Sequence, residues 1–330
     1  MTTIEQKFAK NYKTVVDDVD KKLSLLLKNR KPKSIYEPCS YILEGKGKRL
    51  RPFLVLVSAK TVGGSFSKVY NAAIAVEILH SFTLVHDDIM DNSDKRRGRV
   101  TLHKKYDLNT AILVGDNLNA LAYESLLKDC KKNVNEIVST FTQCIVEVCE
   151  GQSLDKEFEM RNDVTLKEYK VMIYKKTAAL SEMCCKIGGL IVSGNKKEII
   201  ALSNYGKNLG MAFQIQDDLL DIIADENELG KITGSDLVEG KKTYLFLRAM
   251  QKAKGADKDL LLKIIDNNGI ERSEIENYKN LYIRLGVLQD AKKEIERYTK
   301  LALNSLSVLP NNEGQQLMNW LANVLINRNK

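Results

Sequence analysis

Two short stretches of the chain place carboxylates at helical spacing. "DDIMD" begins at Asp87 and "DDLLD" begins at Asp217, with Asp91 and Asp221 four residues further on. Residues four apart on a helix lie on one face, where two like charges repel unless a cation neutralises them. Carboxylate oxygens suit Mg²⁺, which takes one or two of them together with waters and phosphate oxygens. One such stretch is more often a solvated helix face, but two copies after apolar segments predict a shared magnesium site.

Basic residues follow or precede the acidic stretches in four places. Glycine lets a backbone approach an anion closely, arginine binds phosphate oxygens with two donors, and lysine acts as a point charge. The basic segments are "EGKGKRLRPF" (44–53, with Lys46, Lys48, Arg49 and Arg51), Arg96 and Arg97, Lys175 and Lys176, and "LGKITGSDLVEGKKT" (229–243). Each alone is more often a solvated loop, but acid followed by base, twice, predicts a site for two diphosphates and several Mg²⁺ ions.

The elements that must position these groups are predicted to be helices. The chain has 330 residues, 44% of them hydrophobic, and no proline between residues 53 and 309. Apolar residues recur at spacings of three and four, which indicates helices, whereas β-rich chains need frequent turn residues. We expect an all-α fold in one domain spanning 1–330, because no linker divides the chain. The main helices are predicted at 71–91, 109–129, 135–159, 166–194 and 196–225.

The composition limits the kinds of partner and the cellular compartment that we expect. The formal charge of +8 is spread along the chain and aromatic residues make up only 7%, so a stacking surface for nucleic acid is not expected. The first residues contain no apolar signal segment, and no run approaches 18 apolar residues, so no transmembrane segment is expected. The six cysteines contain no C-x-x-C pair and fit buried thiols in a reducing cytoplasm.

The motifs together resemble those of the trans-prenyl diphosphate synthases, in particular the archaeal-type enzymes, over nearly the whole chain. "GKRLRP" resembles the family's isopentenyl diphosphate loop, and "DDIMDNSDKRRG" its first aspartate-rich motif. "KTAAL", "FQIQDDLLD" and "GKITGSDLVEGKKT" are similar to its mid-helix Lys-Thr, second aspartate-rich motif and lysine loop. The resemblance implies a single-domain isoprenoid-synthase-like helical bundle with a central cavity, working as a homodimer.

Roles carried over by position follow from the resemblance alone. It implies three Mg²⁺ ions held by Asp87, Asp91 and Asp217, with Asp88 and Asp221 in support. It implies an allylic diphosphate held by Arg96, Lys176, Lys231 and Lys241, and isopentenyl diphosphate held by Lys48, Arg51, His80 and Arg97. Thr177 and Gln214 would line the path of the developing cation, Gln152 and Asp155 would lie near the metals, and Arg328 would close the site. By itself, His80 on an apolar helix would more often be a core histidine.

The implied reaction is a head-to-tail condensation of isopentenyl diphosphate with allylic diphosphates of 5, 10 or 15 carbons. Phe82 and Thr83 precede the first acidic motif by five and four residues. In the family, an aromatic residue five but not four positions before this motif accompanies a C20 product. Aromatic residues at both positions accompany a C15 product. We therefore expect geranylgeranyl diphosphate (C20), with farnesyl diphosphate (C15) or a C15/C20 mixture as the alternative. Phe82 could instead pack on a neighbouring helix without limiting the product.

Two other classes compete with this interpretation. A class I terpene cyclase would lack "GKRLRP" and would carry an Asn/Ser/Glu metal motif in place of "DDLLD". A non-catalytic subunit of a heteromeric prenyl synthase would typically have lost the aspartates, and both motifs are intact here. The enzyme is therefore favoured over both.

Overall fold

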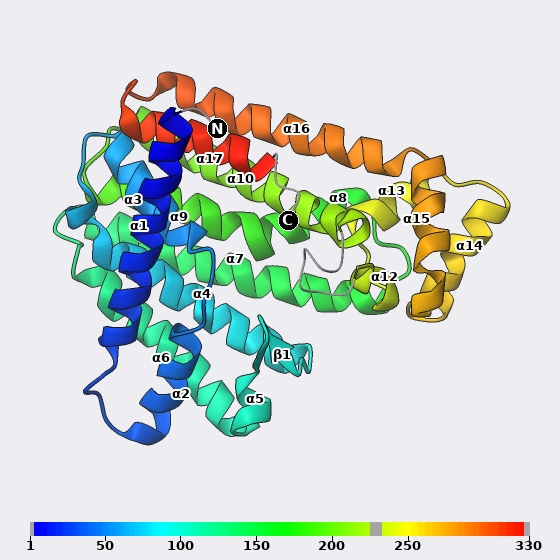
Figure 1. Cartoon of the computed structure of the whole chain (residues 1–330), viewed down its shortest axis with the longest axis horizontal. Helices are drawn as coiled ribbons and strands as arrows, with labels where there is room; N and C mark the ends of the chain where they lie inside the picture. The colour runs from blue at the N-terminus through cyan, green and yellow to red at the C-terminus, as the bar shows by residue number, and fades with distance from the viewer. Residues whose placement is uncertain (1–2, 225–232, 327–330) are drawn as a thin grey trace. The chain divides into compact units, whose positions relative to one another are not determined.

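The computed structural model describes residues 3–224 and 233–326, and nearly all of their regular structure is helical (Figure 1). The predicted helices at 71–91, 109–129, 135–159 and 196–225 are present as α4 (Tyr70–Met90), α6 (Leu108–Leu127), α7 (Val134–Met160) and α10 (Lys196–Ile223). The all-α prediction is confirmed. Across the described ranges, no helix combines the length and the apolar character that crossing a membrane requires.

The chain divides into two compact units. Unit 1 comprises 1–142, 183–203 and 308–320, and unit 2 comprises 143–182, 204–307 and 321–330. Unit 1 contains α1 (Thr3–Leu26), α2 (Lys33–Leu43), α3 (Leu50–Thr61), α4, β1 (Lys95–Arg96), β2 (Arg99–Val100), α5 (Leu102–Lys105) and α6. Unit 2 contains α8 (Leu166–Ile173), α12 (Ser235–Val238), α13 (Tyr244–Lys252), α14 (Ala256–Asp266), α15 (Ile275–Arg284) and α16 (Val287–Ser305). Helices α7, α9 (Ala179–Ile191), α10 and α17 (Glu313–Ile326) contribute residues to both. The prediction of one domain stays a prediction.

Helix α4 is the central helix of unit 1. Its residues are buried from Ala72 through Phe82 on every side, as expected for a helix that is apolar around its circumference. Helix α6 packs along it (Figure 1). A side chain added at Gly115 of α6 would meet the His86 ring at 2.1 Å, so glycine allows this close packing. Burial of the preceding turns holds the C-terminal end of α4, and with it the first acidic motif, in place.

A short hairpin after α4 was not predicted. Strands β1 and β2 pair Lys95 with Val100 and Arg96 with Arg99. The two residues between the strands, Arg97 and Gly98, have φ values of 51° and 77°. Positive φ at both central residues is the mark of a type I′ turn, whose twist matches that of paired strands. Two-residue strands are too short to show alternation in the sequence, so pattern analysis could not detect them.

The predicted helix 166–194 is present but contains one irregular turn. Residues Tyr174–Ala178 form a π-helical turn between α8 and α9. Turns of this kind carry one extra residue and frequently occur at functional sites. Lys176 and Thr177, the Lys-Thr pair singled out in the sequence, lie within it. The π-helical turn therefore changes the direction in which this pair points relative to a regular helix.

Helix α7 approaches the π-helical turn closely because it has a glycine there. A Cβ added at Gly151 would lie 2.3 Å from the backbone nitrogen of Lys176. Real Cβ atoms do not approach backbone so closely, and backbone cannot rotate away as a side-chain end can. The distance between α7 and the π-helical turn therefore depends on the absence of a side chain at residue 151.

We predict that Gly151→Ala destabilises the protein. Alanine favours helix over glycine by about 1 kcal/mol, but overpacking against the Lys176 backbone costs about 1–3 kcal/mol. The free energy of unfolding, measured by urea denaturation, should therefore fall. Ser153→Ala, at an exposed position of the same helix, is the control and should not reduce it. A Gly151→Ala variant as stable as the wild type would contradict this account of the packing.

Candidate active site

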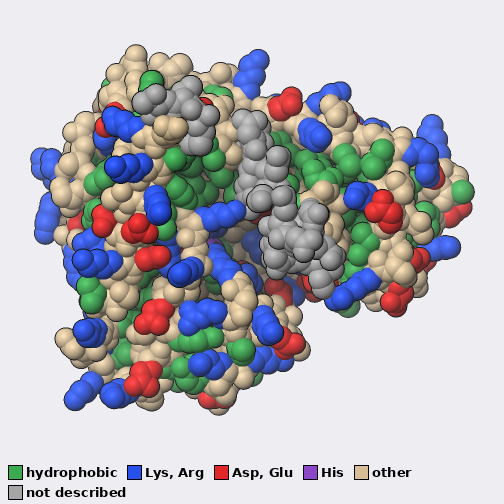
Figure 2. All heavy atoms as spheres, viewed as in Figure 1, with side chains coloured by type: hydrophobic (Ala, Val, Ile, Leu, Met, Phe, Trp, Pro, Cys, Tyr) green, Lys and Arg blue, Asp and Glu red, His purple; other side chains and the backbone are tan. Residues whose placement is uncertain are grey.

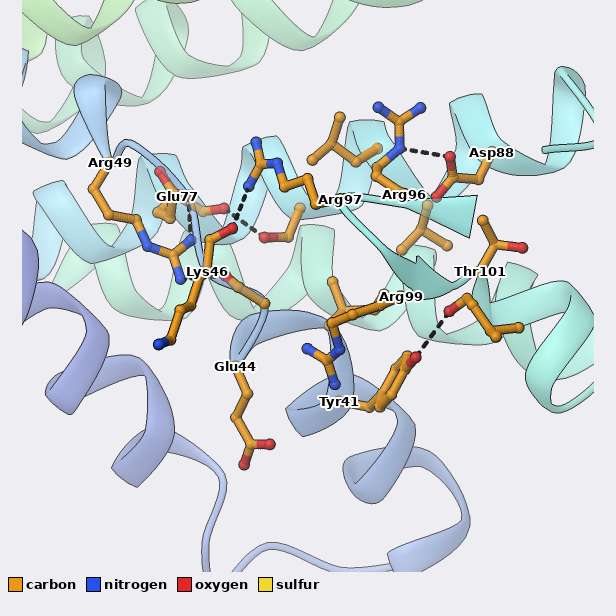
Figure 3. A pocket seen from close by; sticks show the side chains of 16 residues that line it. Tyr41, Glu44, Lys46, Arg49, Glu77, Asp88, Arg96, Arg97, Arg99 and Thr101 are labelled. Carbon is orange, nitrogen blue, oxygen red and sulfur yellow. Dashed lines mark hydrogen bonds and ion pairs between the residues drawn. The ribbon is translucent and has the colours of Figure 1, made fainter. Parts of the chain in front are cut away.

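One group of predicted site residues lies in unit 1, around a cavity of about 400 Å³ (Figure 3). The loop before α3, the C-terminal part of α4 and the β1–β2 hairpin surround it. Its lining includes the basic residues Lys46, Arg49, Arg96, Arg97 and Arg99. The structure thus gathers basic groups from two segments that are some fifty residues apart in the sequence.

The aspartates of the first motif divide into two kinds. Asp87 is partly exposed and Asp91, which follows the last residue of α4, is exposed. Asp88 is only 3% exposed, and its Oδ1 accepts a hydrogen bond from Nε of Arg96 at 2.5 Å (Figure 3). Burial raises the pKa of Asp88, and the Arg96 guanidinium opposes that rise. Asp87 and Asp91 are therefore accessible to solvent, whereas Asp88 is buried and anchors Arg96.

Arg51 and His80 form a pair in the same unit. Nη1 of Arg51 lies 3.0 Å from Nε2 of His80. Burial lowers the pKa of His80 well below its usual value, and the charges of Arg51 and Arg97 lower it further. A neutral His80 can accept a hydrogen bond from Arg51 through Nε2. His80 therefore orients one of the predicted isopentenyl diphosphate ligands, a contact that the sequence did not reveal.

Another group of predicted site residues lies in unit 2, beside a cavity of about 140 Å³ lined in part by Asp155, Lys176, Thr177 and Gln214. Oγ1 of Thr177 donates to Oε1 of Gln214 at 2.9 Å. Nε2 of Gln214 donates in turn to Oδ1 of Asp218 at 3.1 Å. These two bonds orient the Gln214 amide at the cavity wall, so the predicted cation-path residues are brought together in the structure.

Asp218 occupies the same place in the second motif that Asp88 occupies in the first. It is 5% exposed, whereas Asp217 is partly exposed. Its Oδ2 accepts hydrogen bonds from the Tyr169 hydroxyl and, at 3.0 Å, from the Tyr244 backbone N–H. Burial, with a smaller contribution from the charge of Asp236, raises the pKa of Asp218 to about 7. Asp218 therefore organises the interior, and Asp217 is the accessible carboxylate.

Asp221 has a structural partner in the lysine loop. Its two carboxylate oxygens accept hydrogen bonds from Oγ of Ser235 at 2.8 Å and from the backbone N–H of Asp236 at 3.1 Å. Both donors belong to the first turn of α12, where backbone N–H groups lack partners within a helix. Asp221 thus caps α12 and ties the lysine loop to the end of α10.

Two predicted lysines are held by carboxylates beside the unit 2 cavity. Nζ of Lys176 donates to Asp155. Nζ of Lys241 lies 2.6 Å from Glu239 and 3.5 Å from Asp236. Burial works against the charged form of Lys241, but the Asp236 and Glu239 charges raise its pKa overall, so it is cationic. Carboxylates thus hold both lysines at the edge of this cavity, whose lining includes the two side chains.

The accessible aspartates lie where a cation stabilises the helices that carry them. Both acidic motifs lie in the last two turns of α4 and α10, and neither helix has a basic residue in its last turn. The C-terminal end of a helix carries partial negative charge, so carboxylates there are unfavourable. No three Asp, Glu, His or Cys side chains of the described ranges form a metal cluster by themselves. Mg²⁺ commonly takes one or two carboxylates with waters and phosphate oxygens, and the accessible aspartates fit that mode.

Comparison with known proteins identifies the family of this chain. The polyprenyl synthetase family model matches residues 32–282. Geranylgeranyl diphosphate synthase of Sulfolobus acidocaldarius is 37% identical over 329 residues, covering 98% of this chain and 99% of the relative. The chain belongs to the polyprenyl synthetase family.

Solved structures of polyprenyl synthetases agree with this assignment. Geranylgeranyl pyrophosphate synthetase from Pyrococcus horikoshii superposes with a TM-score of 0.92 at 36% identity, covering 99% of this chain and 100% of that one. A polyprenyl synthase from Caulobacter crescentus, complexed with calcium and isoprenyl diphosphate, gives 0.89 at 25% identity over 99% and 98%. The predicted isoprenoid-synthase-like all-α fold is confirmed.

Some predicted residues of this polyprenyl synthetase lie outside the described ranges, and sequence reasoning missed others. Lys231 and Arg328 fall outside 3–224 and 233–326. Gln152 is 5% exposed, and neither polar atom of its side chain has a hydrogen-bond partner within those ranges. Arg99, stacked 3.9 Å from the Tyr41 ring, and Tyr169, bonded to Asp218, were missed. Of these two residues, only Arg99 has a signal in the sequence, because it follows the arginine pair by two residues.

The low pKa of buried His80 can be tested through the stability of this polyprenyl synthetase at acid pH. Unfolded histidine binds a proton near pH 6.5, and buried His80 does so only at much lower pH, so lowering the pH favours unfolding. Between pH 6.5 and 5.5 the wild type should lose about 1 kcal/mol more stability than His80→Gln, which keeps an acceptor for Arg51. Urea denaturation at both pH values measures the difference. Equal losses would show that His80 takes up its proton equally in both states.

Proposed function

We propose that this protein condenses isopentenyl diphosphate with allylic diphosphates and releases geranylgeranyl diphosphate. The observation that carries the proposal is the common arrangement of both acidic motifs. In each, the first aspartate is accessible at a helix end, and the second is buried and hydrogen-bonded. The second aspartate of each motif also lines a cavity whose wall includes basic residues. The similarity to proteins named geranylgeranyl diphosphate synthases supports geranylgeranyl diphosphate as the product.

The carboxylates of Asp87, Asp91 and Asp217 would hold Mg²⁺, three ions by the family pattern, with Asp88 and Asp221 in support. Bound Mg²⁺ supplies positive charge to the leaving diphosphate. Arg96, anchored by Asp88, would add to this charge from unit 1. Lys176 and Lys241 would do so from unit 2, and Lys231 is proposed with them. Lys48, Arg51 and Arg97 would hold isopentenyl diphosphate, with His80 orienting Arg51.

Ionisation of the allylic C–O bond leaves a cation that this chain must protect. The Gln214 amide and the Thr177 hydroxyl present fixed dipoles at the unit 2 cavity. Preorganised dipoles stabilise developing charge without reorganising during the reaction. The alkene of isopentenyl diphosphate then attacks, and a proton is lost to the departing diphosphate. No protein nucleophile takes part in this scheme.

The product length would be set on α4. Phe82 is 9% exposed, and its ring lies 4.8 Å from the His86 ring in an edge-on arrangement. His86 in turn contacts α6 at Gly115. Thr83 is partly exposed and donates to the backbone oxygen of His80 at 2.8 Å. A large, well-supported ring at residue 82 and a small residue at 83 support a C20 limit.

The direct test is a product assay. The purified protein is incubated with Mg²⁺, isopentenyl diphosphate and each allylic starter, and the alcohols are sized after hydrolysis. A dominant C20 alcohol is expected. A dominant C15 alcohol would keep the chemistry and overturn the product length, and no elongation from any starter would favour a non-catalytic subunit.

Asp87→Asn and Asp217→Asn should each reduce turnover about 100- to 1,000-fold. Each substitution keeps the side-chain size and removes a charge that would hold a cation, and one lost electrostatic contact to a transition state costs about 3–4 kcal/mol. The Mg²⁺ concentration for half-maximal activity should also rise. Asp266→Asn, at the exposed end of α14, is the matched control and should leave both quantities unchanged. Aspartate variants with wild-type turnover would contradict the metal assignment.

Phe82→Ala should shift the product beyond C20, because it removes the ring proposed to limit the length of the product. Chain-length analysis of the alcohols measures the change. Phe66→Ala removes a partly exposed ring on the short helix before α4 and serves as the control. An unchanged product distribution from an active Phe82→Ala enzyme would show that this ring only packs against its neighbours.

We also propose a cytoplasmic homodimer. The exposed apolar side chains of α6 support pairing; they are Leu108, Ile112, Leu113 and Leu127. Figure 2 shows both basic and acidic side chains distributed over the visible face, which supports small anionic substrates over nucleic acid. None of the six cysteines, all within the described ranges, forms a disulfide, which supports a reducing compartment.

A further inference from the structure

Arg49 lies between two predicted substrate ligands in the sequence, but its side chain is far more buried than theirs. Lys48 is exposed and Arg51 partly exposed, whereas only 3% of the Arg49 side chain is exposed. The backbone of Arg49 has a φ of 46°, in the left-handed region that non-glycine residues rarely adopt. The same residue of the loop thus has a buried side chain and an unusual backbone conformation, and the two features share one cause.

The Arg49 guanidinium bonds four acceptors. Its Nη1 donates to Oε1 of Glu77 at 2.6 Å (Figure 3), and its Nε donates to Oδ1 of Asp20 at 2.7 Å. Its Nη2 donates to the backbone oxygens of Gly45 at 2.6 Å and Leu43 at 3.3 Å. Only arginine offers five donors in a fixed planar fork, so lysine could not make the same set. The side chain therefore closes the loop onto its own backbone and joins it to two helices.

The two helices hold neighbouring residues of the loop. On α1, Asp20 binds the Arg49 side chain, and the Tyr12 hydroxyl donates to the backbone oxygen of Lys48. The Tyr12 ring is itself held edge-on to Phe53 of α3, with 4.9 Å between ring centres. Helix α1 thus contacts the loop at two consecutive residues, one through a side chain and one through the backbone.

Two acceptors on α4, three residues apart, bind two arginines of the loop that are two residues apart. Glu77, which is 3% exposed, receives Arg49, and His80 receives Arg51. Residues three apart on a helix lie on adjacent positions of one face. The two pairs together set the register of the loop against α4, which also carries the first acidic motif.

Net stability alone does not explain such a network. Replacing a buried ion pair by apolar side chains of similar volume is often neutral or stabilising, because removing charges from water is costly. A buried pair does, however, specify geometry, since its hydrogen bonds form in one arrangement only. The helices that hold Arg49 also hold the Lys48 backbone and the Arg51 side chain, whose positions an incoming diphosphate would require.

We propose that Arg49 is a positioning residue, which Glu77 and Asp20 hold in place, and that it sets Lys48 and Arg51 for isopentenyl diphosphate. The inference rests on the proposed function. It separates the two substrates, because the described residues proposed to hold the allylic diphosphate bond to acceptors outside this network; they are Arg96, Lys176 and Lys241. Loosening the network should weaken binding of isopentenyl diphosphate and leave that of the allylic substrate unchanged.

The test measures KM for each substrate separately in Arg49→Lys, Glu77→Gln and Asp20→Asn. Losing charged hydrogen bonds should raise KM for isopentenyl diphosphate about ten- to a hundred-fold in Arg49→Lys and Glu77→Gln. KM for the allylic diphosphate should change less than about two-fold, within the range of substitutions that touch no contact. Glu124→Gln breaks the Arg30–Glu124 pair, an Arg–Glu pair at the surface, and should change neither value.

Each outcome decides the matter. Folded variants that melt at lower temperature but keep both KM values would overturn the proposal and leave the network a stability role only. An equal rise in both KM values would also overturn it. If Glu77→Gln does not fold, Asp20→Asn remains informative, because the Asp20 side chain is 37% exposed and its loss removes one of the four contacts.

A failure of the proposed function would look different. The wild type would then show no elongation with any starter, and calorimetry with isopentenyl diphosphate alone would replace the kinetics. Weaker binding to Arg49→Lys than to the wild type would support the positioning role without the reaction. Equal binding to both proteins, or none to the wild type, would overturn it.

Discussion

Charge repulsion at two helix ends is the constraint on which the candidate site depends. Carboxylates crowd the C-terminal turns of α4 and α10, where the helix dipole also carries partial negative charge. One aspartate of each motif is relieved by burial with hydrogen-bond donors, Asp88 with Arg96 and Asp218 with Tyr169. The other aspartates of these helix ends are more accessible, and Mg²⁺ commonly binds one or two accessible carboxylates together with phosphate oxygens, so a cation-dependent, diphosphate-binding chemistry fits this chain.

Helix burial supplies the rigidity that this chemistry needs. Helix α4 is buried on every side from Ala72 through Phe82, before its acidic end, and this packing fixes the positions of its aspartates. In unit 2, Gly151 allows α7 to approach the π-helical turn that presents Lys176. Buried side-chain bonds then orient the groups at the surface, as His80 does for Arg51 and Asp218 does for Gln214.

Much of the fold followed from hydrophobic periodicity. The long helices, such as 71–91, could be predicted because apolar residues at three and four spacing report one buried face over many turns. The β1–β2 hairpin could not, because two-residue strands have no period. The π-helical turn was also missed, since one extra residue leaves the average spacing almost unchanged.

The sequence by itself determined which chemistry is available, because residue types and helical spacing place carboxylates four apart and arginines beside glycines whatever the packing. Only the tertiary structure decided what each charged residue does. Arg49 and Lys48 are neighbours with similar side chains, yet one is buried on Glu77 and the other is exposed. Direction depends on backbone conformation, here a φ of 46°, and on acceptors from distant helices, neither of which local spacing reports.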